Sequence, residues 1–438
     1  MAPMADPRAS RNRRRLTATV TDLGVRRQRA LLVAVAPDGR AGAEAEVSLA
    51  ELERLADTAG SDTVAREIQS LARPDPATFM GKGKAAELAA LGHRLDVDVV
   101  VVDGELTPVQ QRNLQQIFGC DVVDRVAVIL DIFAQHATSK EGMAQVELAL
   151  LRHRLPRLRG RGLQLSQQAG RIGTRGPGET QLESDRRRVQ RRISILEDQI
   201  EDLRTTRATQ RKARRRSGLP TAALVGYTNA GKSSLLNRLT GAGVLVEDRL
   251  FSTLDATVRR LTLPSGRLVL LSDTVGFVRR LPHELVEAFR STLEEAVETD
   301  LLVHVVDAAA PDPDGQIEAV HTTLAQVGGG GHEEVLVVNK VDAAPAPVVA
   351  RLLALHPGAV AVSAATGAGL DGLLTALDEH VARGTLDLDL LIPHSRGDLV
   401  AALHRVAEVL AQDHGAQGVR LAVRLPSAEA APFLAFTL

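Results

Sequence analysis

One stretch of the sequence has the residue types and spacing that hold a phosphate group. TAALVGYTNAGKSSLLNRL contains two glycines five positions apart, then Lys232 and Ser233, after an apolar run and before a helical pattern. Glycines let backbone N–H groups wrap around phosphates, a lysine neutralises their charge, and a serine hydroxyl binds Mg²⁺. The residues predicted to form this phosphate loop are Gly226, Tyr227, Thr228, Asn229, Ala230, Gly231, Lys232, Ser233 and Ser234.

A second motif supplies the acidic group that a nucleotide–metal complex requires. Asp273 ends the apolar run LVLLSD and begins the motif DTVG. An Asp at this place anchors Mg²⁺ through water, and the backbone N–H of Gly276 can reach the γ-phosphate. Thr274 and Val275 lie between these two residues and belong to the predicted site.

A third motif predicts which base is bound. NKVD follows the apolar run VLVV, and its Asp342 can accept hydrogen bonds from N1–H and N2–H₂ of guanine. Adenine would leave this carboxylate poorly paired, which costs free energy. We expect Asn339 to face the base edge and the stem of Lys340 to lie along the ring, with Val341 beside them.

Two loops complete the predicted site. FSTLDAT lies where a mobile loop should supply a second hydroxyl to Mg²⁺, and Thr253 is preferred because Thr257 adjoins the next strand. SAA can bring backbone N–H groups to guanine O6, so the five motifs together predict a GTP-binding domain. The loop residues added to the site are Phe251, Ser252, Thr253, Leu254, Asp255, Ser363, Ala364 and Ala365.

The predicted hydrolysis machinery differs at one place from that of Ras-like enzymes. Those enzymes orient the attacking water with a Gln directly after the glycine of DxxG, where this chain has Phe277. The catalytic set is therefore incomplete, or the missing group comes from elsewhere, and we expect slow hydrolysis by the free protein. The predicted catalytic residues are Lys232, Thr253, Asp273 and Gly276, and the predicted metal ligands are Ser233 and Thr253.

Asn229, inside the phosphate loop, has two interpretations. Some related GTPases use an Asn at this place to hold K⁺ near the phosphates, where the ion cancels charge in the transition state. Alternatively, Asn229 simply fits the turn of the loop. The sequence favours neither, so the predicted cofactors are Mg²⁺ and, under the first interpretation, K⁺.

A strongly basic region precedes this domain. Residues 152–216 contain 19 Arg or Lys and 7 Asp or Glu, although the whole chain has a net charge of −1. Within it, RIGTRGPGETQLESDRRR joins a Gly- and Pro-rich loop to a helix that begins acidic and becomes basic. A basic tip on a stiff hairpin suits structured RNA, whereas a solvated helix face is the alternative. The predicted RNA-binding residues are Arg171, Arg175, Arg186 and Arg187.

Apolar runs and helical periodicity predict an α/β multidomain fold. A P-loop GTPase domain with a mixed, mostly parallel sheet follows a small α/β domain and an antiparallel helical hairpin, and precedes a small α/β C-terminal piece. In that last piece we expect strand, helix and strand, with the helix running through DLVAALHRVAEVLAQ. The predicted regions are a disordered basic leader at 1–25, an α/β domain at 26–137, the hairpin with its Gly-rich basic loop at 138–216, the GTPase domain at 218–383 and the C-terminal piece at 384–438.

Composition excludes several classes of protein. The chain has one cysteine, Cys120, which rules out a disulfide framework and indicates a reducing cytosol. The arginines near the N-terminus are not followed by the apolar segment of a secretory signal. No uncharged apolar run approaches the roughly 18 residues of a membrane span. We therefore expect a cytoplasmic protein without integral membrane association.

The motifs together resemble the HflX family of translation-associated GTPases. The resemblance rests on GYTNAGKSS, FSTLDAT, DTVGF and NKVD and extends upstream through LTPVQQRNL, VVDRVAVILDIFAQHA, GMAQVELALL and GTRGPGETQLESDRRR. It covers roughly residues 75 to 385. In one departure, family members usually have three successive glycines before IGTRGPGE, where this chain has Ala169, Gly170 and Arg171.

The resemblance implies a GTPase whose N-terminal region contacts the large ribosomal subunit near its peptidyl transferase centre. It implies a protein that splits or rescues stalled ribosomes, with GTP or GDP setting its affinity, and we expect a monomer off the ribosome. Two other functions remain open. One is a nucleotide-dependent RNA remodeller that uses ATP or GTP, although the chain has no second complete phosphate loop. The other is a GTP switch that recruits a protein partner through its first and last domains.

Overall fold

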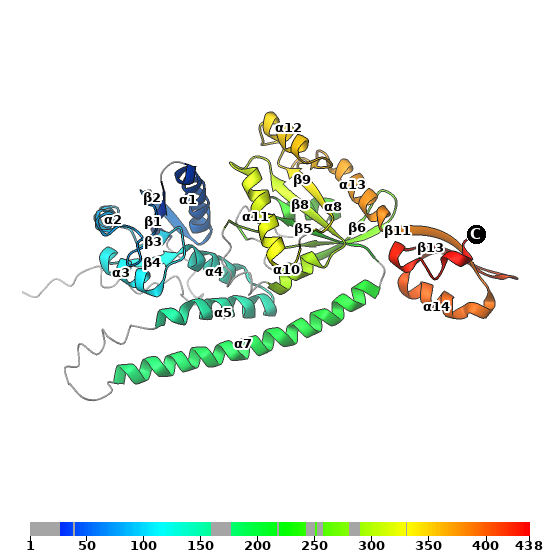
Figure 1. The fold of residues 1–438 in the computed structure, drawn as a ribbon, viewed down its shortest axis with the longest axis horizontal. Coiled ribbons are helices and arrows are strands. Elements are labelled where there is room, and N and C mark those ends of the chain that lie inside the picture. The colour runs from blue at the N-terminus through cyan, green and yellow to red at the C-terminus, as the bar shows by residue number, and fades with distance from the viewer. Residues whose placement is uncertain are drawn as a thin grey trace, which may run out of the picture. The chain divides into compact units, whose positions relative to one another are not determined.

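The computed structural model describes residues 27–37, 40–158, 177–216, 219–241, 250–251, 257–279, 290–329 and 331–438 of the chain. Contacts within the chain divide it into two compact units (Figure 1). The first unit contains the described residues up to Asp198 together with 250–251, and the second contains the described residues from Gln199 on without that pair. Each unit is described separately below.

The first unit is built on a parallel sheet of four strands in the order β2-β1-β3-β4. All four valines of β3 are buried, as is typical of a parallel sheet covered on both faces. The core continues from Leu31 and Val100 on the sheet to Leu88 and Leu114 on two helices. The elements are β1 (Gln28–Ala36), α1 (Arg40–Thr58), β2 (Ser61–Ser70), α2 (Lys82–Arg94), β3 (Val99–Val102), α3 (Pro108–Phe118) and β4 (Asp121–Asp124).

Local sequence signals set the ends of α3. The Thr107 side chain accepts a hydrogen bond from the backbone N–H of Gln110, and the Gln110 side chain accepts one from the backbone of Thr107. This reciprocal pair satisfies two N–H groups that would otherwise lack partners at the start of a helix. The helix ends at Gly119, whose φ of 69° is the left-handed conformation that glycine adopts at low cost.

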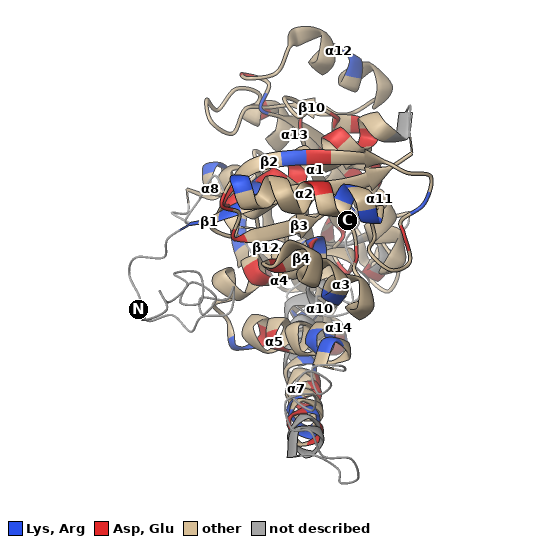
Figure 2. Cartoon of the chain, turned by 90° about the vertical axis from the view of Figure 1, so that its left-hand side faces the viewer, with Lys and Arg blue, Asp and Glu red and all other residues tan. Residues whose placement is uncertain are grey.

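In the described residues between β4 and β5, the α-helices are α4 (Arg125–His136), α5 (Lys140–Arg154) and the long α7 (Pro177–Arg216). The α5 and α7 helices lie side by side, and Arg192 makes two hydrogen bonds of 2.8 and 2.6 Å to the carboxylate of Glu147. A second ion pair links Arg152 to Glu197 at 2.8 Å. Figure 2 shows charged residues of both signs along α7. The helices therefore form the predicted hairpin, held in part by charge pairs.

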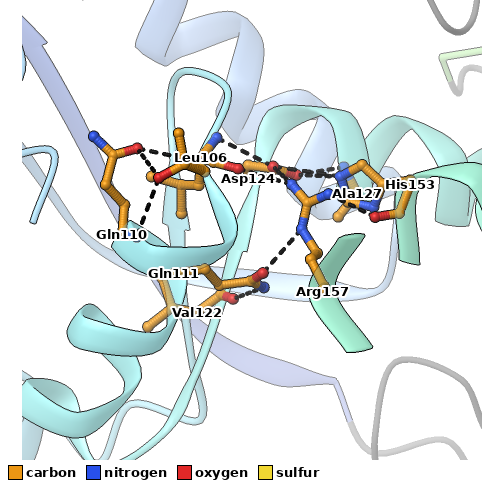
Figure 3. A network of polar contacts seen from close by, with 9 residues as sticks. Leu106, Gln110, Gln111, Val122, Asp124, Ala127, His153 and Arg157 are labelled. Carbon is orange, nitrogen blue, oxygen red and sulfur yellow. Dashed lines mark hydrogen bonds and ion pairs between the residues drawn. The ribbon is translucent and has the colours of Figure 1, made fainter. Parts of the chain in front are cut away.

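A buried carboxylate ties the end of α5 to the sheet of the first unit (Figure 3). Asp124 accepts hydrogen bonds from Nη2 of Arg157 at 2.7 Å and from the backbone N–H of Ala127 at 2.9 Å. Nε2 of His153 lies 3.3 Å from the same carboxylate. Burial opposes ionisation of Asp124, but the hydrogen bond and charge of His153 and the charge of Arg157 outweigh it and hold its pKa below the ordinary value. Arg157 belongs to the short helix Pro156–Leu158, so this network fixes the chain directly before residues 159–176.

The second unit contains a six-stranded sheet in the order β10-β9-β8-β5-β7-β6. All neighbouring pairs are parallel except β6 and β7, which gives the mixed, mostly parallel sheet that the sequence predicts. The elements are β5 (Thr221–Gly226), α8 (Lys232–Thr240), β6 (Thr257–Thr262), β7 (Leu268–Asp273), α10 (Arg290–Val297), β8 (Leu301–Asp307), α11 (Pro313–Gln326), β9 (Glu334–Asn339), α12 (Ala346–Leu355), β10 (Val360–Ala361) and α13 (Leu370–Arg383).

The C-terminal piece differs from its prediction in one helix. The α14 helix (Gly397–Val406) ends early, and EVLAQ belongs to β12 (Glu408–Gly415), so the prediction of a helix through Gln412 was wrong. β12 pairs antiparallel with β13 (Gly418–Pro426), which also pairs antiparallel with β11 (Thr385–Ile392). Pairing with β13 thus decides the conformation of a segment whose own pattern suits a helix. Among the described residues, no helix is both long and apolar enough to cross a membrane.

Candidate nucleotide-binding site

The motifs predicted to bind nucleotide meet at one edge of the second unit's sheet. Four neighbouring parallel strands end there, β5 at Gly226, β7 at Asp273, β8 at Asp307 and β9 at Asn339. In open α/β sheets, ligands bind outside the carboxyl ends of the strands. The fold therefore brings segments that are far apart in the sequence to one place.

Backbone geometry explains both glycines of the phosphate loop. Gly226 has a φ of 148°, and a Cβ there would lie 2.2 Å from the carbonyl oxygen of Val305. Gly231 has a φ of 95°, and a Cβ there would lie 2.3 Å from Nδ2 of Asn339. No larger residue fits either position. Asn229 also has a left-handed φ of 59°, which Asn tolerates better than most residues, so the turn interpretation of Asn229 has a structural reason.

Lys232 is buried at the start of α8 and points into the loop. Its Nζ donates hydrogen bonds to the carbonyl oxygens of Gly226 at 3.0 Å and Tyr227 at 2.9 Å. Burial lowers the pKa of Lys232 to about 8, against the opposing effect of the negative charge of Asp273. An anionic phosphate would supply charge compensation that the neutral carbonyls do not. The loop thus holds a cation ready for a phosphate.

Ser233 and Asp273 form the part of the site suited to a metal ion. The Ser233 hydroxyl donates a 2.6 Å hydrogen bond to Oδ2 of Asp273, which is buried. Oδ1 of the same carboxylate accepts a hydrogen bond from the backbone N–H of Thr274 at 3.0 Å, and the Thr274 hydroxyl donates to the carbonyl of Leu224 at 2.6 Å. Hydroxyl and carboxylate oxygens are the ligands that Mg²⁺ prefers, so this pair fits the predicted metal.

The DTVG segment packs directly against the phosphate loop. A Cβ at Gly276 would lie 2.8 Å from Cα of Thr228 and 3.1 Å from Nζ of Lys232, so only glycine allows this approach. The next residue, Phe277, is 1% exposed, and its backbone exchanges hydrogen bonds with the loop at Gly226 and Thr228. Its ring is part of the core. Phe277 therefore has a structural role and leaves the attacking water without a side chain from this position.

Asn339 connects two loops of the site. Its Nδ2 donates to the carbonyl of Ala230 at 2.8 Å, and its Oδ1 accepts from the backbone N–H of Ala364 at 3.0 Å. Both polar atoms of the amide are thus bonded to loops, which differs from the contact with the base edge that the sequence suggested. The two charged side chains of the motif, Lys340 and Asp342, differ in their surroundings. Lys340 has a φ of 61° and its Nζ bonds to Asp307 at 2.8 Å, whereas Asp342 is exposed.

The backbone N–H groups of the SAA loop differ in whether they already have an acceptor. The backbone N–H of Ser363 donates to the carbonyl of Ala368 at 2.9 Å, and that of Ala364 is used by Asn339. In the described part of the chain, no acceptor pairs with the backbone N–H of Ala365. Of the three predicted amides, that of Ala365 is therefore the one without a bonded acceptor in the described part of the chain.

Several predicted residues lie elsewhere. Phe251 is described within the first unit, where its ring packs edge-on against Phe133 with centroids 4.6 Å apart. Arg186 and Arg187 lie on α7, and the Arg187 side chain is 72% exposed and pairs with Glu183 at 2.9 Å. The predicted residues outside the described part are Ser252, Thr253, Leu254, Asp255, Arg171 and Arg175.

Tyr227 and Thr274 belong to the predicted site, but the contacts by which they support it were not predicted. The hydroxyl of Tyr227 accepts a 2.6 Å hydrogen bond from the backbone N–H of Arg279 and so joins the phosphate loop to the segment after DTVG. The hydroxyl of Thr274 bonds to β5. Tyr227 is the only tyrosine in the chain, which could have drawn attention to it, but nothing in the sequence indicates its partner.

Comparisons with known proteins bear on most of the chain. Residues 46–134 match a family described as "GTP-binding GTPase N-terminal", residues 136–214 one described as "GTP-binding GTPase Middle Region", and residues 221–340 one described as "50S ribosome-binding GTPase". The chain is 45% identical to the GTPase HflX of Caldanaerobacter subterraneus subsp. tengcongensis over 90% of each chain. It is 42% identical to the GTPase HflX of Escherichia coli strain K12 over 86% of this chain and 89% of the relative.

A solved structure is also similar along most of its length. It is a GTP-binding protein from the archaeon Sulfolobus solfataricus in complex with GDP, 22% identical, with a TM-score of 0.42. The match covers 81% of this chain and 99% of that one.

Proposed function

The chain belongs to the HflX family of GTPases, and from this premise we propose that it uses GTP to control its binding to the large ribosomal subunit, where it splits or rescues stalled ribosomes. Binding and hydrolysis of GTP are the activities of this family and of the P-loop domain at 221–340. The observation that carries the ribosomal part is the match of that domain to a family described as 50S ribosome-binding GTPases.

The nucleotide would be held by groups that already have a fixed position. Backbone N–H groups of the phosphate loop would surround the phosphates, and the buried ammonium of Lys232 would neutralise their charge. The Ser233 hydroxyl and the Asp273 carboxylate would hold Mg²⁺, directly and through water. When bound, Mg²⁺ neutralises charge on the β- and γ-phosphates. Thr253 is proposed as its second hydroxyl ligand.

Guanine would be selected by Asp342. Its carboxylate is exposed, and in the described part of the chain no hydrogen bond to it is formed. It is therefore available to accept both N1–H and N2–H₂ of guanine, while the backbone N–H of Ala365 donates to O6. Adenine offers the wrong pattern at each of these atoms, which is why ATP would bind less tightly.

Hydrolysis by the free protein would be slow because the position after Gly276 holds a core side chain. Phe277 cannot polarise a water molecule, and its backbone is committed to the phosphate loop. A partner that supplies or orders the missing group would then accelerate the reaction. For this chain we propose that the partner is the large ribosomal subunit.

The contact with ribosomal RNA is proposed for the basic tip and stem of the hairpin. Arg187 is exposed on α7, and among the described residues its charge pairs with Glu183 on the same helix, an interaction of little free energy that a phosphate could replace. The network around Asp124 holds the end of α5 and Arg157 in place, directly before residues 159–176. Arg171, Arg175, Arg186 and Arg187 are the proposed phosphate contacts.

Sedimentation with purified large subunits tests this function. The full chain should sediment with large subunits in the presence of a non-hydrolysable GTP analogue and much less with GDP. A variant with all four arginines changed to Ala should remain in the supernatant while keeping its affinity for the analogue. Equal sedimentation in both nucleotide states would contradict a nucleotide-controlled ribosome factor.

A further inference from the structure

Three metal-ligating side chains from different elements converge in the second unit, and none of them belongs to the predicted nucleotide motifs. His304 lies on β8, His321 on α11, and Glu334 is the first residue of β9. One ligand atom from each lies within 4.8 Å of the other two. In the described part of the chain, this is the one group of three or more such residues that comes together in this way.

The geometry places one carboxylate between two imidazoles. Nδ1 of His304 lies 2.8 Å from Oε1 of Glu334, and Nε2 of His321 lies 2.9 Å from Oε2. The two rings are 5.2 Å apart between centroids and steeply inclined, at 70°. In a tetrahedral site with metal–nitrogen and metal–oxygen bonds near 2.1 Å, neighbouring ligand atoms are about 3.4 Å apart. The three ligand atoms, which all lie within 4.8 Å of one another, are therefore near this spacing.

The three side chains of the cluster differ in how far they are exposed to solvent. The His304 side chain is 1% exposed, that of Glu334 is 25% exposed and that of His321 is 49% exposed. Burial lowers the pKa of His304, so its imidazole is neutral near pH 7 and can offer a lone pair. Burial acts against ionisation of Glu334, but hydrogen bonds from both histidines outweigh it and lower its pKa to about 2. The hydrogen bond to Glu334 raises the pKa of His321, so a metal ion has to displace a proton from that imidazole when it binds.

We propose that His304, His321 and Glu334 bind one divalent transition-metal ion of the Zn²⁺ type. Two imidazoles and one carboxylate suit Zn²⁺, whereas Mg²⁺ prefers a shell of oxygen ligands and would stay at the nucleotide site. Three protein ligands leave a fourth position for water, which the exposed side at His321 allows. On binding, the ion displaces the protons that now join the imidazoles to Glu334.

The ion would cross-link α11 to the two strands that lead to the proposed guanine site. β8 continues from His304 to Asp307, which bonds to Lys340, and β9 continues from Glu334 to Asn339. An ion bound only to the folded protein stabilises it by mass action. At a free metal concentration of 100 times the dissociation constant, the ratio of folded to unfolded protein rises about 100-fold.

Metal binding to the full, nucleotide-free chain tests the site. After removal of metals with a chelator, Zn²⁺ is titrated against a chromophoric competitor, and thermal unfolding is followed with and without Zn²⁺. The wild type should bind one equivalent more than His321→Asn and Glu334→Gln, and only the wild type should gain the corresponding thermal shift. Glu333→Gln is the matched control, since this neighbouring carboxylate is exposed and lies outside the cluster.

Co²⁺ gives a readout that does not depend on the variants. One equivalent bound to the wild type should produce the visible absorption bands of a nitrogen-ligated, low-coordinate ion, and Zn²⁺ should remove them. No such bands, or equal Zn²⁺ binding and thermal shift in all four proteins, would overturn the proposal. The cluster would then be a hydrogen-bonded bridge between α11 and the sheet only.

Discussion

The hydroxyl of Ser233 and the carboxylate of Asp273 are joined by a 2.6 Å hydrogen bond although 40 residues separate them in the sequence. We propose that this pair sets the place of Mg²⁺ before nucleotide binds. Asp273→Asn removes the charge that anchors the ion, so Mg²⁺-dependent GTP affinity should fall at least tenfold, or about 1.4 kcal/mol. Titration of GTP binding with and without Mg²⁺ measures this loss. The exposed Asp371→Asn is the control, and an unchanged Mg²⁺ dependence in Asp273→Asn would show that the metal is held elsewhere.

The pH dependence of GTP binding should report on Lys232. Burial lowers its pKa to about 8 in the protein without nucleotide, and a bound phosphate would raise it again. Below this pH the lysine is charged before and after binding. Above it, binding must take up a proton, so GTP affinity should fall as the pH rises through 8. Calorimetry of GTP binding, done about one pH unit above the pKa of Lys232 in two buffers with different ionisation enthalpies, measures the proton uptake. Equal heats in both buffers would rule out this linkage.

Asp342 should decide between guanine and adenine. GDP and GTP should bind at least ten times more tightly than ADP and ATP, a difference of about 1.4 kcal/mol or more. Asp342→Asn should remove most of this preference. The amide has an NH₂ donor in place of one carboxylate oxygen, so it cannot accept hydrogen bonds from both N1–H and N2–H₂ of guanine. Competition binding with the four nucleotides gives the answer for both proteins. If the preference for guanine survives the substitution, groups other than Asp342 select the base.

The buried carboxylate of Asp124 should stabilise the first unit. Its pKa is held below the ordinary 3.8, so its contribution is full at neutral pH and is lost as the pH falls through the lowered value. Asp124→Asn leaves Arg157 and His153 without their anion and should cost about 3–5 kcal/mol at pH 7. Chemical unfolding followed by circular dichroism measures the change, with the exposed Asp121→Asn as control. If Asp124→Asn lowers the free energy of unfolding as much in strong acid as at pH 7, the charge of Asp124 is not the cause.

Strands that end in chemically active residues could be predicted because they are buried on both faces. β5, β7, β8 and β9 read as short apolar runs with a glycine, aspartate or asparagine at the end. The edge strand β2 reads SDTVAREIQS and was not predicted, and the edge strand β6, which reads TVRRLT, was expected only as the strand that adjoins Thr257. Their polar side chains face solvent, so local hydrophobicity gives no signal.

Tertiary contacts explain the remaining differences. β12 was predicted as the end of a helix because its pairing with β13 is invisible in its own sequence. The role of Asn339 was also hidden, since its partners Ala230 and Ala364 lie 109 and 25 residues away. Residue types at the site follow from chemistry, but which atoms they contact depends on loop geometry that no spacing rule gives.

The central claim is that the large ribosomal subunit completes a GTPase whose own catalytic set lacks a water-orienting side chain at Phe277. The most direct measurement is the rate of GTP hydrolysis by the full chain as purified large subunits are added, with small subunits as the control. We predict a low rate for the free protein and a rise that saturates with large subunits and is absent with small ones. A rate that does not change on addition of large subunits would contradict the claim.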